Sequence, residues 1–399
     1  MTARSFLVML NPRARGTAPT LHTLAVFNHT IMARKPLTRR EFLKLTALGL
    51  GSLAFRHWNS LALLPDFPDA ERLGRAAKGS LEIKAQPDMN SETVGILYED
   101  NVAPWIREVV SDYQDLNFIN QRWVEVPGGY VYGARFQPVR NIPNEPVTEL
   151  PNSSIGPGMW AEVTVPYVDA FTENDPSPNS WVDFRVRDGL PPRLYYSQIF
   201  WVDRIRTNDA GQVFYRVNPN YYGGLDLLWA PGEAFRPITK EEIAPIRPEV
   251  ENKRIVVDIN HQTLSCYEGD TEVYFCRISS GAKYNVAGEV VDAWSTPAGE
   301  FWISRKYLGV QMSGNATGAP YDSPGIGWSM FFATGGVALH STYWHNAYGT
   351  PMSHGCVNAS PEDAKWIFRW TAPEVPYDPG MLDATVTGLP STKVEVVEV

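Results

Sequence analysis

The chain has 399 residues, 44% of them hydrophobic and 20% charged, which is the balance of a globular protein with two or three domains. Its formal net charge of −9 argues against a nucleic-acid partner, because such a partner requires a basic face. Aromatic residues (12%) occur together with 32 prolines and 31 glycines. Many aromatics and turn formers favour short strands over long helices, so we expect a mainly β fold.

The first 56 residues contain an export pattern. Residues 38–44 read Thr-Arg-Arg-Glu-Phe-Leu-Lys, and the apolar stretch that follows from Leu45 to Phe55 is too short to span a bilayer comfortably. This arrangement is typical of signal peptides, and the paired arginines resemble a twin-arginine export signal. Because such signals begin close to the arginines, we expect Met32 to be the true start. The expected location is therefore the cell envelope, and no clear cleavage site follows, so membrane anchoring through this segment stays open.

After the targeting region, the composition and the pattern of apolar residues divide the chain into further segments. Residues 57–78 have prolines and scattered charges without a period, and we interpret them as a linker. Over 79–143, short stretches of alternating apolar and polar residues are separated by turn clusters, which predicts a small barrel or sandwich and resembles a bacterial SH3-like domain. A second β-rich stretch, 152–240, is interpreted as a β-rich module, with a second SH3-like domain as the alternative to an unrelated β fold. A proline-rich segment then leads into a last domain, 250–390.

The chemistry of the chain is concentrated near its C-terminal end. Three of the seven histidines and one of the three cysteines fall within residues 340–358, which read His-Ser-Thr-Tyr-Trp-His-Asn-Ala-Tyr-Gly-Thr-Pro-Met-Ser-His-Gly-Cys-Val-Asn. A thiol becomes a good nucleophile as its thiolate, and a nearby imidazole can accept its proton. Gly355 lets the backbone pass close to a substrate, so that neighbouring N–H groups can face a developing oxyanion.

A helix is predicted to begin just after this segment. Ser360 is a typical N-cap, Pro361 suits the first helical position, and Glu362 and Asp363 place acids in the first turn. Cys356 lies a few residues before this helix start, which we expect to favour its thiolate.

Ser353-His354-Gly355-Cys356-Val357-Asn358, with His340 sixteen residues before the cysteine (356 − 340), resembles the signature of the L,D-transpeptidase catalytic domain, the YkuD-like family. The Ile-Val-Val-Asp strand at 255–258, Ser280-Gly281 and Thr296-Pro297-Ala298-Gly299 fit the same family. The resemblance covers residues 253–388. It implies a β-rich C-terminal domain with a short helix after the nucleophile, preceded by one or two small SH3-like barrels.

The resemblance also implies roles for individual residues. Cys356 would be the nucleophile and His340 the base, with the backbone of Ser341 orienting the imidazole. The N–H groups of His354, Gly355 and Cys356 would form the oxyanion hole. Further residues would support the loop or line the groove, namely Ser353 and Asn358 for the loop, and Trp344 with Tyr321 or Trp328 for the groove.

The substrate implied by the family is a peptidoglycan stem peptide. Cleavage between its third residue and D-alanine would give a thioester, and a side-chain amine of a second stem would then form a 3→3 cross-link. No cofactor and no metal is implied. Water attacking the thioester would make the protein an L,D-carboxypeptidase instead.

Three alternatives explain residues 340–358 less well. A zinc site built from His340, His345, His354 and Cys356 has spacings that match no known ligand pattern. A papain-like wall peptidase needs its cysteine before its histidine, whereas here no histidine follows Cys356. A non-catalytic wall-binding protein would not need this constellation. The remaining cysteines, Cys266 and Cys276, flank a predicted hairpin turn at 268–270 and either pair or pack as small apolar residues.

Overall fold

The structure is a computed structural model that describes residues 64–112, 120–154, 156–173, 180–218, 227–284, 288–291, 294–314 and 321–398. By contacts the chain divides into two units, Met1–Arg56 and His57–Val399, and all described residues belong to the second. The predicted targeting region and the first residues of the predicted linker lie outside the described residues. Within the described part, no helix has the length and apolar character needed to cross a membrane.

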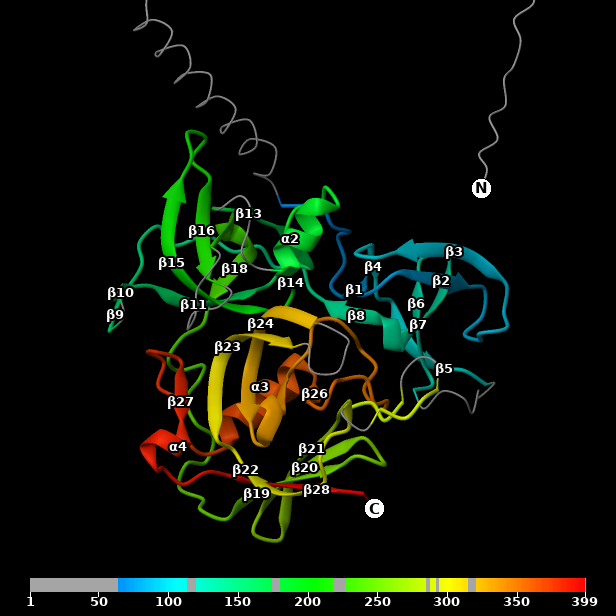
Figure 1. Cartoon of the computed structure of the whole chain (residues 1–399). Helices are drawn as coiled ribbons and strands as arrows, with labels where there is room; N and C mark the ends of the chain where they lie inside the picture. Colours follow the sequence, from blue (N-terminus) through cyan, green and yellow to red (C-terminus); the bar gives the residue numbers. More distant parts are fainter. Residues whose placement is uncertain are drawn as a thin grey trace, which may run out of the picture. The chain divides into compact units, whose positions relative to one another are not determined.

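Strands dominate the described residues, which confirms the mainly β prediction (Figure 1). The first group of strands, here called the N-terminal β unit (residues 73–139), forms two small sheets with the orders β4-β1-β8 and β3-β2-β7-β6-β5. Its elements are β1 (Leu73–Ala76), β2 (Ser80–Lys84), β3 (Thr93–Tyr98), β4 (Val102–Pro104), β5 (Arg107–Val110), β6 (Arg122–Val126), β7 (Gly129–Tyr132), η1 (Gly133–Arg135) and β8 (Phe136–Val139). A shared apolar core includes Leu81, Trp105, Val124 and Phe136.

The N-terminal β unit begins earlier than the sequence indicated. Strand β1 lies inside the predicted linker 57–78, is buried at every position and pairs with both β4 and β8, so the linker prediction is wrong for residues 73–76. The strand was missed because Gly74 and Arg75 interrupt the apolar alternation, and Arg75 can be buried only because it finds charged and polar partners elsewhere in the fold. The likeness to an SH3-like domain stays a prediction.

The middle β unit (residues 152–237) is built on a six-stranded antiparallel sheet with the order β13-β17-β16-β15-β11-β18. Its elements are β9 (Asn152–Ser153), β10 (Gly156–Pro157), β11 (Met159–Val163), β12 (Tyr167–Asp169), β13 (Phe171–Thr172), α2 (Ser180–Arg187), β14 (Arg193–Tyr195), β15 (Ile199–Thr207), β16 (Val213–Asn218), β17 (Leu228–Pro231), η2 (Gly232–Ala234) and β18 (Phe235–Pro237). Trp160, Ile199 and Trp201 of this sheet belong to the apolar core of the C-terminal domain, so the two parts pack as one body.

The C-terminal domain contains two five-stranded sheets with the orders β21-β20-β19-β28-β22 and β26-β25-β24-β23-β27. Its elements are β19 (Lys253–Asp258), β20 (Thr263–Glu268), β21 (Thr271–Arg277), β22 (Gly299–Trp302), β23 (Arg305–Gly314), β24 (Tyr321–Phe331), η4 (Thr334–Gly336), β25 (Ala338–Ser341), β26 (Val357–Ala359), α3 (Pro361–Trp370), β27 (Met381–Asp383), α4 (Ala384–Thr387) and β28 (Lys393–Val397). The hairpin predicted at 268–270 joins β20 to β21, and its Gly269 has a φ of 59°.

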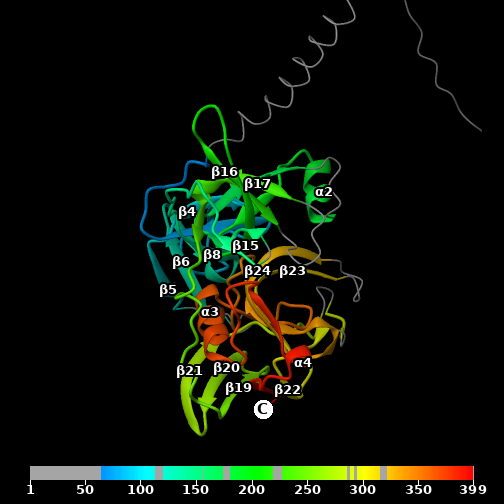
Figure 2. The same ribbon diagram turned by 90° about the vertical axis from the view of Figure 1, so that its left-hand side faces the viewer.

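The last strand extends the domain beyond its predicted end at residue 390. Strand β28 lies between β19, to which it is parallel, and β22, to which it is antiparallel. In both views β19 and β22 lie beside the C-terminal end of the chain (Figure 1, Figure 2). Val394 and Val396 of this strand alternate with more exposed residues and belong to the core.

Helix α3 begins at Pro361, which confirms the short helix predicted after residue 356. The Ser360 hydroxyl accepts a hydrogen bond from the Asp363 N–H, as an N-cap should. Its buried face, which includes Ala364, Ile367 and Phe368, packs in the core between the sheets. At its other end the side chain of buried Lys306 donates to the carbonyls of Phe368, Thr371 and Pro373 at 2.6–2.8 Å. It thus satisfies one carbonyl in the last turn of the helix and two in the segment that follows.

Candidate active site

The segment from His340 to Asn358 leaves one strand and returns beside it. Strands β25 and β26 are parallel neighbours, with His340 paired to Asn358. Side chains two residues apart in an extended chain share a face, so Cys356, just before β26, lies on the same face as His340 and Asn358. The fold therefore joins the two ends of an irregular loop and brings the two reactive side chains to one place.

This face opens into a cleft of about 650 Å³. Residues predicted for the site make up much of its wall, namely Tyr321, His340, Trp344, Ser353, His354, Cys356 and Asn358. The other residues of the wall from the C-terminal domain are Met312, Ser323, Ile326, His345, Ala347, Thr350 and Met352.

The His340 ring is buried and has a defined tautomer. Its Nδ1 lies 2.8 Å from the Ser341 carbonyl, which can only accept, so Nδ1 carries the proton and Nε2 keeps its lone pair. The Ser341 hydroxyl in turn donates to the Gly327 carbonyl at 2.9 Å, which fixes the residue that orients the ring. Burial lowers the pKa of His340 to about 4, so the imidazole is a neutral base at neutral pH.

The Cys356 thiol is protonated at rest. Burial raises its pKa to about 11, while the Ala338 N–H facing the sulfur acts weakly in the opposite direction. The Sγ atom donates to the Gly336 carbonyl at 3.8 Å. The expected help from the helix start stays a prediction. The resting pair is thus a neutral thiol beside a neutral imidazole.

Two glycines and one threonine fix the backbone next to the cysteine. Gly355 has a φ of 119°, and its Cα would lie 2.9 Å from a Cβ placed on Gly281, so neither position tolerates a side chain without strain. The Thr296 hydroxyl accepts from the Gly281 N–H and donates to the Gly355 carbonyl, both at 2.8 Å. Thr296 was quoted as part of the Thr-Pro-Ala-Gly stretch but was not among the predicted site residues.

Ser353 closes the turn that carries the cysteine. Its hydroxyl donates to the Cys356 carbonyl at 2.5 Å and accepts from the Gly355 N–H at 3.1 Å. This second bond occupies one of the three predicted oxyanion donors. The N–H groups of His354 and Cys356 are then the ones that the prediction leaves for a substrate oxygen.

The family model of the L,D-transpeptidase catalytic domain (YkuD) matches residues 252–396. Residues 252–396 form an L,D-transpeptidase catalytic domain. Among curated proteins, L,D-transpeptidase 2 of Mycobacterium tuberculosis is 25% identical over 191 residues, which are 41% of this chain and 44% of that protein. The probable L,D-transpeptidase 3 of the same species is 30% identical over 83 residues, 19% of this chain and 31% of that protein. The chain thus spans less than half the length of either relative.

Solved structures of L,D-transpeptidases also match this chain. The catalytic domain of the Enterococcus faecium L,D-transpeptidase is 25% identical with a TM-score of 0.27, and the match covers 37% of this chain and 98% of that one. An L,D-transpeptidase from Mycobacterium smegmatis is 20% identical with a TM-score of 0.27, covering 49% and 81%.

Asn358 of the L,D-transpeptidase domain is fully buried and joined to His345. The His345 Nδ1 accepts from the Ala347 N–H at 3.1 Å, so a neutral ring carries its proton on Nε2. The Asn358 Nδ2 lies 3.0 Å from that nitrogen, and its Oδ1 has no partner among the described residues. Because two N–H donors cannot bond each other, we assign the flipped amide, with the Asn358 oxygen accepting from His345 Nε2. His345 is buried, and burial lowers its pKa to about 3.

The aromatic residues of the domain divide between cleft and core. Trp344 lies beside the His340 ring, with centroids 5.9 Å apart, and Tyr321 lies 5.5 Å from the His354 ring. Trp328, the alternative to Tyr321, is buried against Phe368 and does not line the cleft. Both residues belong to strand β24, and of the two alternatives Tyr321 is the one that lines the cleft.

Two other predicted features can be compared with the described residues. In that part of the chain, no group of three or more His, Cys, Asp or Glu side chains could hold a metal, so the four residues of the zinc alternative do not form a ligand cluster. Cys266 and Cys276 are buried free thiols, and they are not opposite each other: Cys266 pairs with Tyr274 and Cys276 with Leu264.

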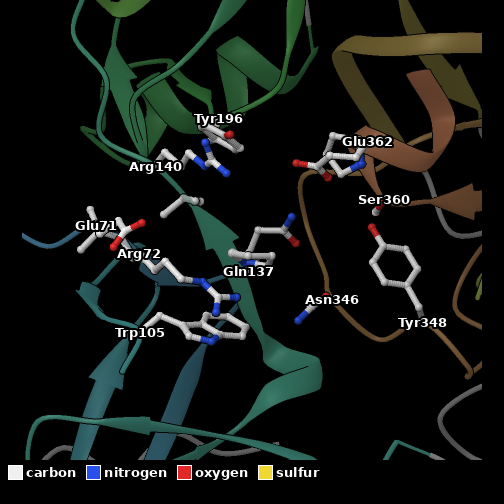
Figure 3. Close-up of a pocket in the computed structure, with 14 residues that line it drawn as sticks. Glu71, Arg72, Trp105, Gln137, Arg140, Tyr196, Asn346, Tyr348, Ser360 and Glu362 are labelled. Atoms are coloured by element: carbon white, nitrogen blue, oxygen red, sulfur yellow. The ribbon is translucent and has the colours of Figure 1, made fainter. Parts of the chain in front are cut away.

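A second cavity, of about 360 Å³, lies away from the cysteine (Figure 3). It is lined by residues 71–73, 105 and 137–140 and by the start of α3 at 360–362. Tyr196 of the middle β unit and the loop residues Asn346 and Tyr348 complete the lining. The Gln137 side chain points into it, and its buried oxygen has no partner among the described residues (Figure 3). Neither Cys356 nor His340 lines this cavity, so it is separate from the site described above.

Proposed function

We propose that this chain is an exported peptidoglycan L,D-transpeptidase with a cysteine nucleophile. The L,D-transpeptidase domain and the names of the curated relatives support the reaction class. The observation that carries the assignment of roles is the His340 tautomer. Its Nδ1–H is held by the Ser341 carbonyl, which leaves Nε2 as the free base in the cleft that Cys356 also lines.

The first half of the reaction forms a thioester. The Cys356 sulfur attacks the carbonyl of the third stem residue while its proton passes to His340 Nε2. Backbone N–H groups at 354 and 356 stabilise the oxyanion. When the tetrahedral intermediate collapses, the C–N bond to D-alanine breaks, and the leaving amine takes the proton from His340.

The second half transfers the acyl group. The side-chain amine of a second stem attacks the thioester and gives a proton to His340, the C–S bond breaks, and the thiol is regenerated with that proton. The product is a 3→3 cross-link. Because resting Cys356 and His340 are both neutral, the pair returns to its starting state without a net exchange of protons.

The test is intact mass spectrometry of a disaccharide tetrapeptide incubated with the full chain. We expect loss of D-alanine together with a cross-linked dimer, absent with Cys356→Ala and retained with Cys276→Ala, which removes a buried thiol elsewhere. A tripeptide without dimer would establish the L,D-carboxypeptidase instead. A folded protein that changes no stem would refute the proposal and favour a non-catalytic wall-binding role.

The proposal includes export by the twin-arginine-type signal and retention at the envelope. Replacing Arg39 and Arg40 by lysine is expected to leave the protein inside the cell, as measured by fractionation. N-terminal sequencing of the precursor tests the start at Met32, and the membrane fraction of the mature protein tests anchoring. Equal export of the lysine variant would contradict the assignment of the signal.

A further inference from the structure

One wall of the active-site cleft does not come from the L,D-transpeptidase domain. Ala77, Lys78, Tyr132, Ala134 and Arg135, all from the N-terminal β unit, line the same cleft as Cys356 and His340. Nothing in the catalytic signature calls for these residues, because more than 200 positions separate them from the cysteine in sequence.

Hydrogen bonds hold this wall of the cleft to residues 342–356, the loop between β25 and β26 that carries Cys356 and is here called the catalytic loop. The Asn346 N–H donates to the Ala134 carbonyl at 3.1 Å, and its side-chain amide donates to the carbonyls of Gly133 at 3.1 Å and Phe136 at 3.3 Å. Asn346 thus satisfies three carbonyls around η1, the short helix that carries Arg135 (Figure 3 shows Asn346 on the loop beside β8). Since its neighbours His345 and Ala347 line the cleft, η1 is fixed relative to the catalytic residues.

A buried arginine fixes the other part of the wall. Arg75, 2% exposed, donates to the Asp100 carboxylate and to the Tyr343 carbonyl, both at 2.7 Å. Asp100 also accepts from Arg193 of the middle β unit at 2.8 Å. Lys78 follows Arg75 by three residues, so its backbone is anchored next to the loop that begins at Tyr343.

The charge of the cleft is unlike that of the chain. Among the described residues that line it, Lys78 and Arg135 are the only ones with a permanent charge, and no carboxylate is present. His340 and His354 add none at neutral pH, because burial lowers the pKa of both. A cationic cleft in a chain of net charge −9 indicates selection for an anionic ligand.

The two cations are free to bind such a ligand. Within the described part of the chain neither makes an ion pair; Arg135 donates only to the Lys78 carbonyl, at 3.0 Å. The nearby carboxylate of Glu99 is engaged by the Gly79 N–H at 2.9 Å. An Arg fork and a Lys ammonium that line the same cleft are suited to a carboxylate.

We propose that Lys78 and Arg135 form a carboxylate-binding subsite of the active-site cleft, contributed by the N-terminal β unit. Its ligand is a carboxylate of the peptide acylated at Cys356 or of the acceptor that attacks it. The identity of that peptide rests on the proposed function, whereas the preference of the cleft for anions does not. The N-terminal β unit then determines which peptides the active site accepts, in addition to any contact that it makes with the cell wall.

The anion preference is tested by alkylating Cys356 in the full chain. The sulfur forms a bond to the CH₂ carbon of iodoacetate or iodoacetamide and iodide leaves, so the two reagents differ in charge. Peptide mapping shows that the alkylated residue is Cys356. We expect the ratio of the iodoacetate rate to the iodoacetamide rate to fall about threefold to tenfold in the double variant Lys78→Gln/Arg135→Gln. It should approach the ratio measured for the thiol of glutathione. High salt should reduce the wild-type ratio. An unchanged ratio in a folded double variant would overturn the proposal.

Matched controls separate local from general effects. Arg204→Gln removes one charge from an exposed position of β15, outside the cleft, and should leave the ratio unchanged. If Arg204→Gln lowered the ratio equally, the effect would be that of net charge, and the subsite would be refuted. The melting temperature of each variant identifies any that fail to fold, and Lys78→Arg, which keeps the charge, should retain the ratio.

Turnover tests the same subsite on a peptide. With tetrapeptide stems, the double variant should raise KM with little change in kcat, and stems with amidated carboxylates should lose this difference. A wild-type protein that turns over no stem while keeping its anion-dependent alkylation would reject the proposed function and leave the subsite standing. Equal KM values for both proteins on both stems would reject the subsite and leave the transpeptidase standing.

Discussion

At the scale of single residues, the site depends on backbone geometry that small side chains hold in place. Thr296 joins Gly281 to Gly355 through one hydroxyl, and Ser353 joins Gly355 to the Cys356 carbonyl. None of these residues performs chemistry on a substrate. They position the peptide units whose N–H groups would face the oxyanion.

Replacing Thr296 by valine keeps its shape and removes the hydroxyl. The buried Gly281 N–H and Gly355 carbonyl would each lose a partner, so we expect a loss of about 2 kcal/mol in the free energy of unfolding. Turnover should fall about tenfold, because the backbone beside Cys356 would shift. Chemical denaturation and steady-state kinetics measure the two effects. Thr296→Ser keeps the hydroxyl and should behave like the wild type; equal losses in both variants would contradict this reading.

The protonation of the Cys356–His340 pair determines how its reactivity varies with pH. With the thiol pKa raised to about 11 and the imidazole pKa lowered to about 4, both groups are neutral between those values. The thiolate fraction, and with it the rate of alkylation by iodoacetamide, should rise about tenfold per pH unit from pH 6 to 9. Stopped aliquots analysed by mass spectrometry give this rate. A rate independent of pH near neutrality would instead indicate a thiolate–imidazolium pair.

At the scale of elements, two parts of the C-terminal domain differ in how well nearby residues predict them. The start of helix α3 is predicted by Ser360, Pro361 and two acidic residues, all of which lie within its first turn or directly before it. Strand β28 has only the alternation of Val394 and Val396 as a local signal, and its importance comes from its place between β19 and β22.

Removing the N-cap of α3 should cost a predictable amount. Ser360→Ala deletes the acceptor for the Asp363 N–H, and we expect the free energy of unfolding to fall by about 1 kcal/mol. Ser360→Asn, which can still cap, serves as the control. If urea denaturation showed Ser360→Ala to be as stable as the wild type, the cap would not contribute.

Ending the chain after residue 390 tests the corrected domain boundary. Without β28, strands β19 and β22 would lose their shared neighbour, and Val394 and Val396 would leave the core. We expect the truncated protein to be unfolded or molten, as seen by circular dichroism and hydrogen exchange. A truncation that removes only residue 399 is the control, and a cooperative melt of the shorter protein would show that the domain does end at 390.

At the scale of the whole molecule, a buried charge network links all three parts of the described chain. Arg75 and Asp100 come from the N-terminal β unit, Arg193 from the middle β unit, and the Tyr343 carbonyl from the catalytic loop. The guanidinium of Arg75 also lies 4.2 Å from the centre of the Tyr195 ring. The cleft therefore depends on how the units pack, and not on the catalytic domain by itself.

Arg75→Met should affect both stability and the cleft. Breaking a buried pair by removing one partner typically costs about 3–5 kcal/mol, because Asp100 then keeps Arg193 as its one charged partner, beside the Tyr195 hydroxyl at 3.3 Å. We expect the loss to appear as a lower midpoint in urea and as a higher KM for stem peptides, since the wall that carries Lys78 is no longer fixed. Arg204→Gln, at an exposed position, should change stability by less than about 0.5 kcal/mol. A stable variant with unchanged KM would show that the network does not position the wall.

The sequence alone indicated the L,D-transpeptidase family of residues 252–396, the residues to which the proposed chemistry is assigned and the start of α3. These depend on residues that lie close together in the chain: the Ser-His-Gly-Cys-Val-Asn run, the preceding histidine, and the local capping pattern at Ser360. Only the tertiary structure decided that β1 and β28 are integral strands, that Trp328 is core, and that Lys78 and Arg135 reach the cleft. Each of these depends on a partner far away in the sequence, and neither periodicity nor spacing records such a partner, because burial and pairing arise only when distant segments pack together.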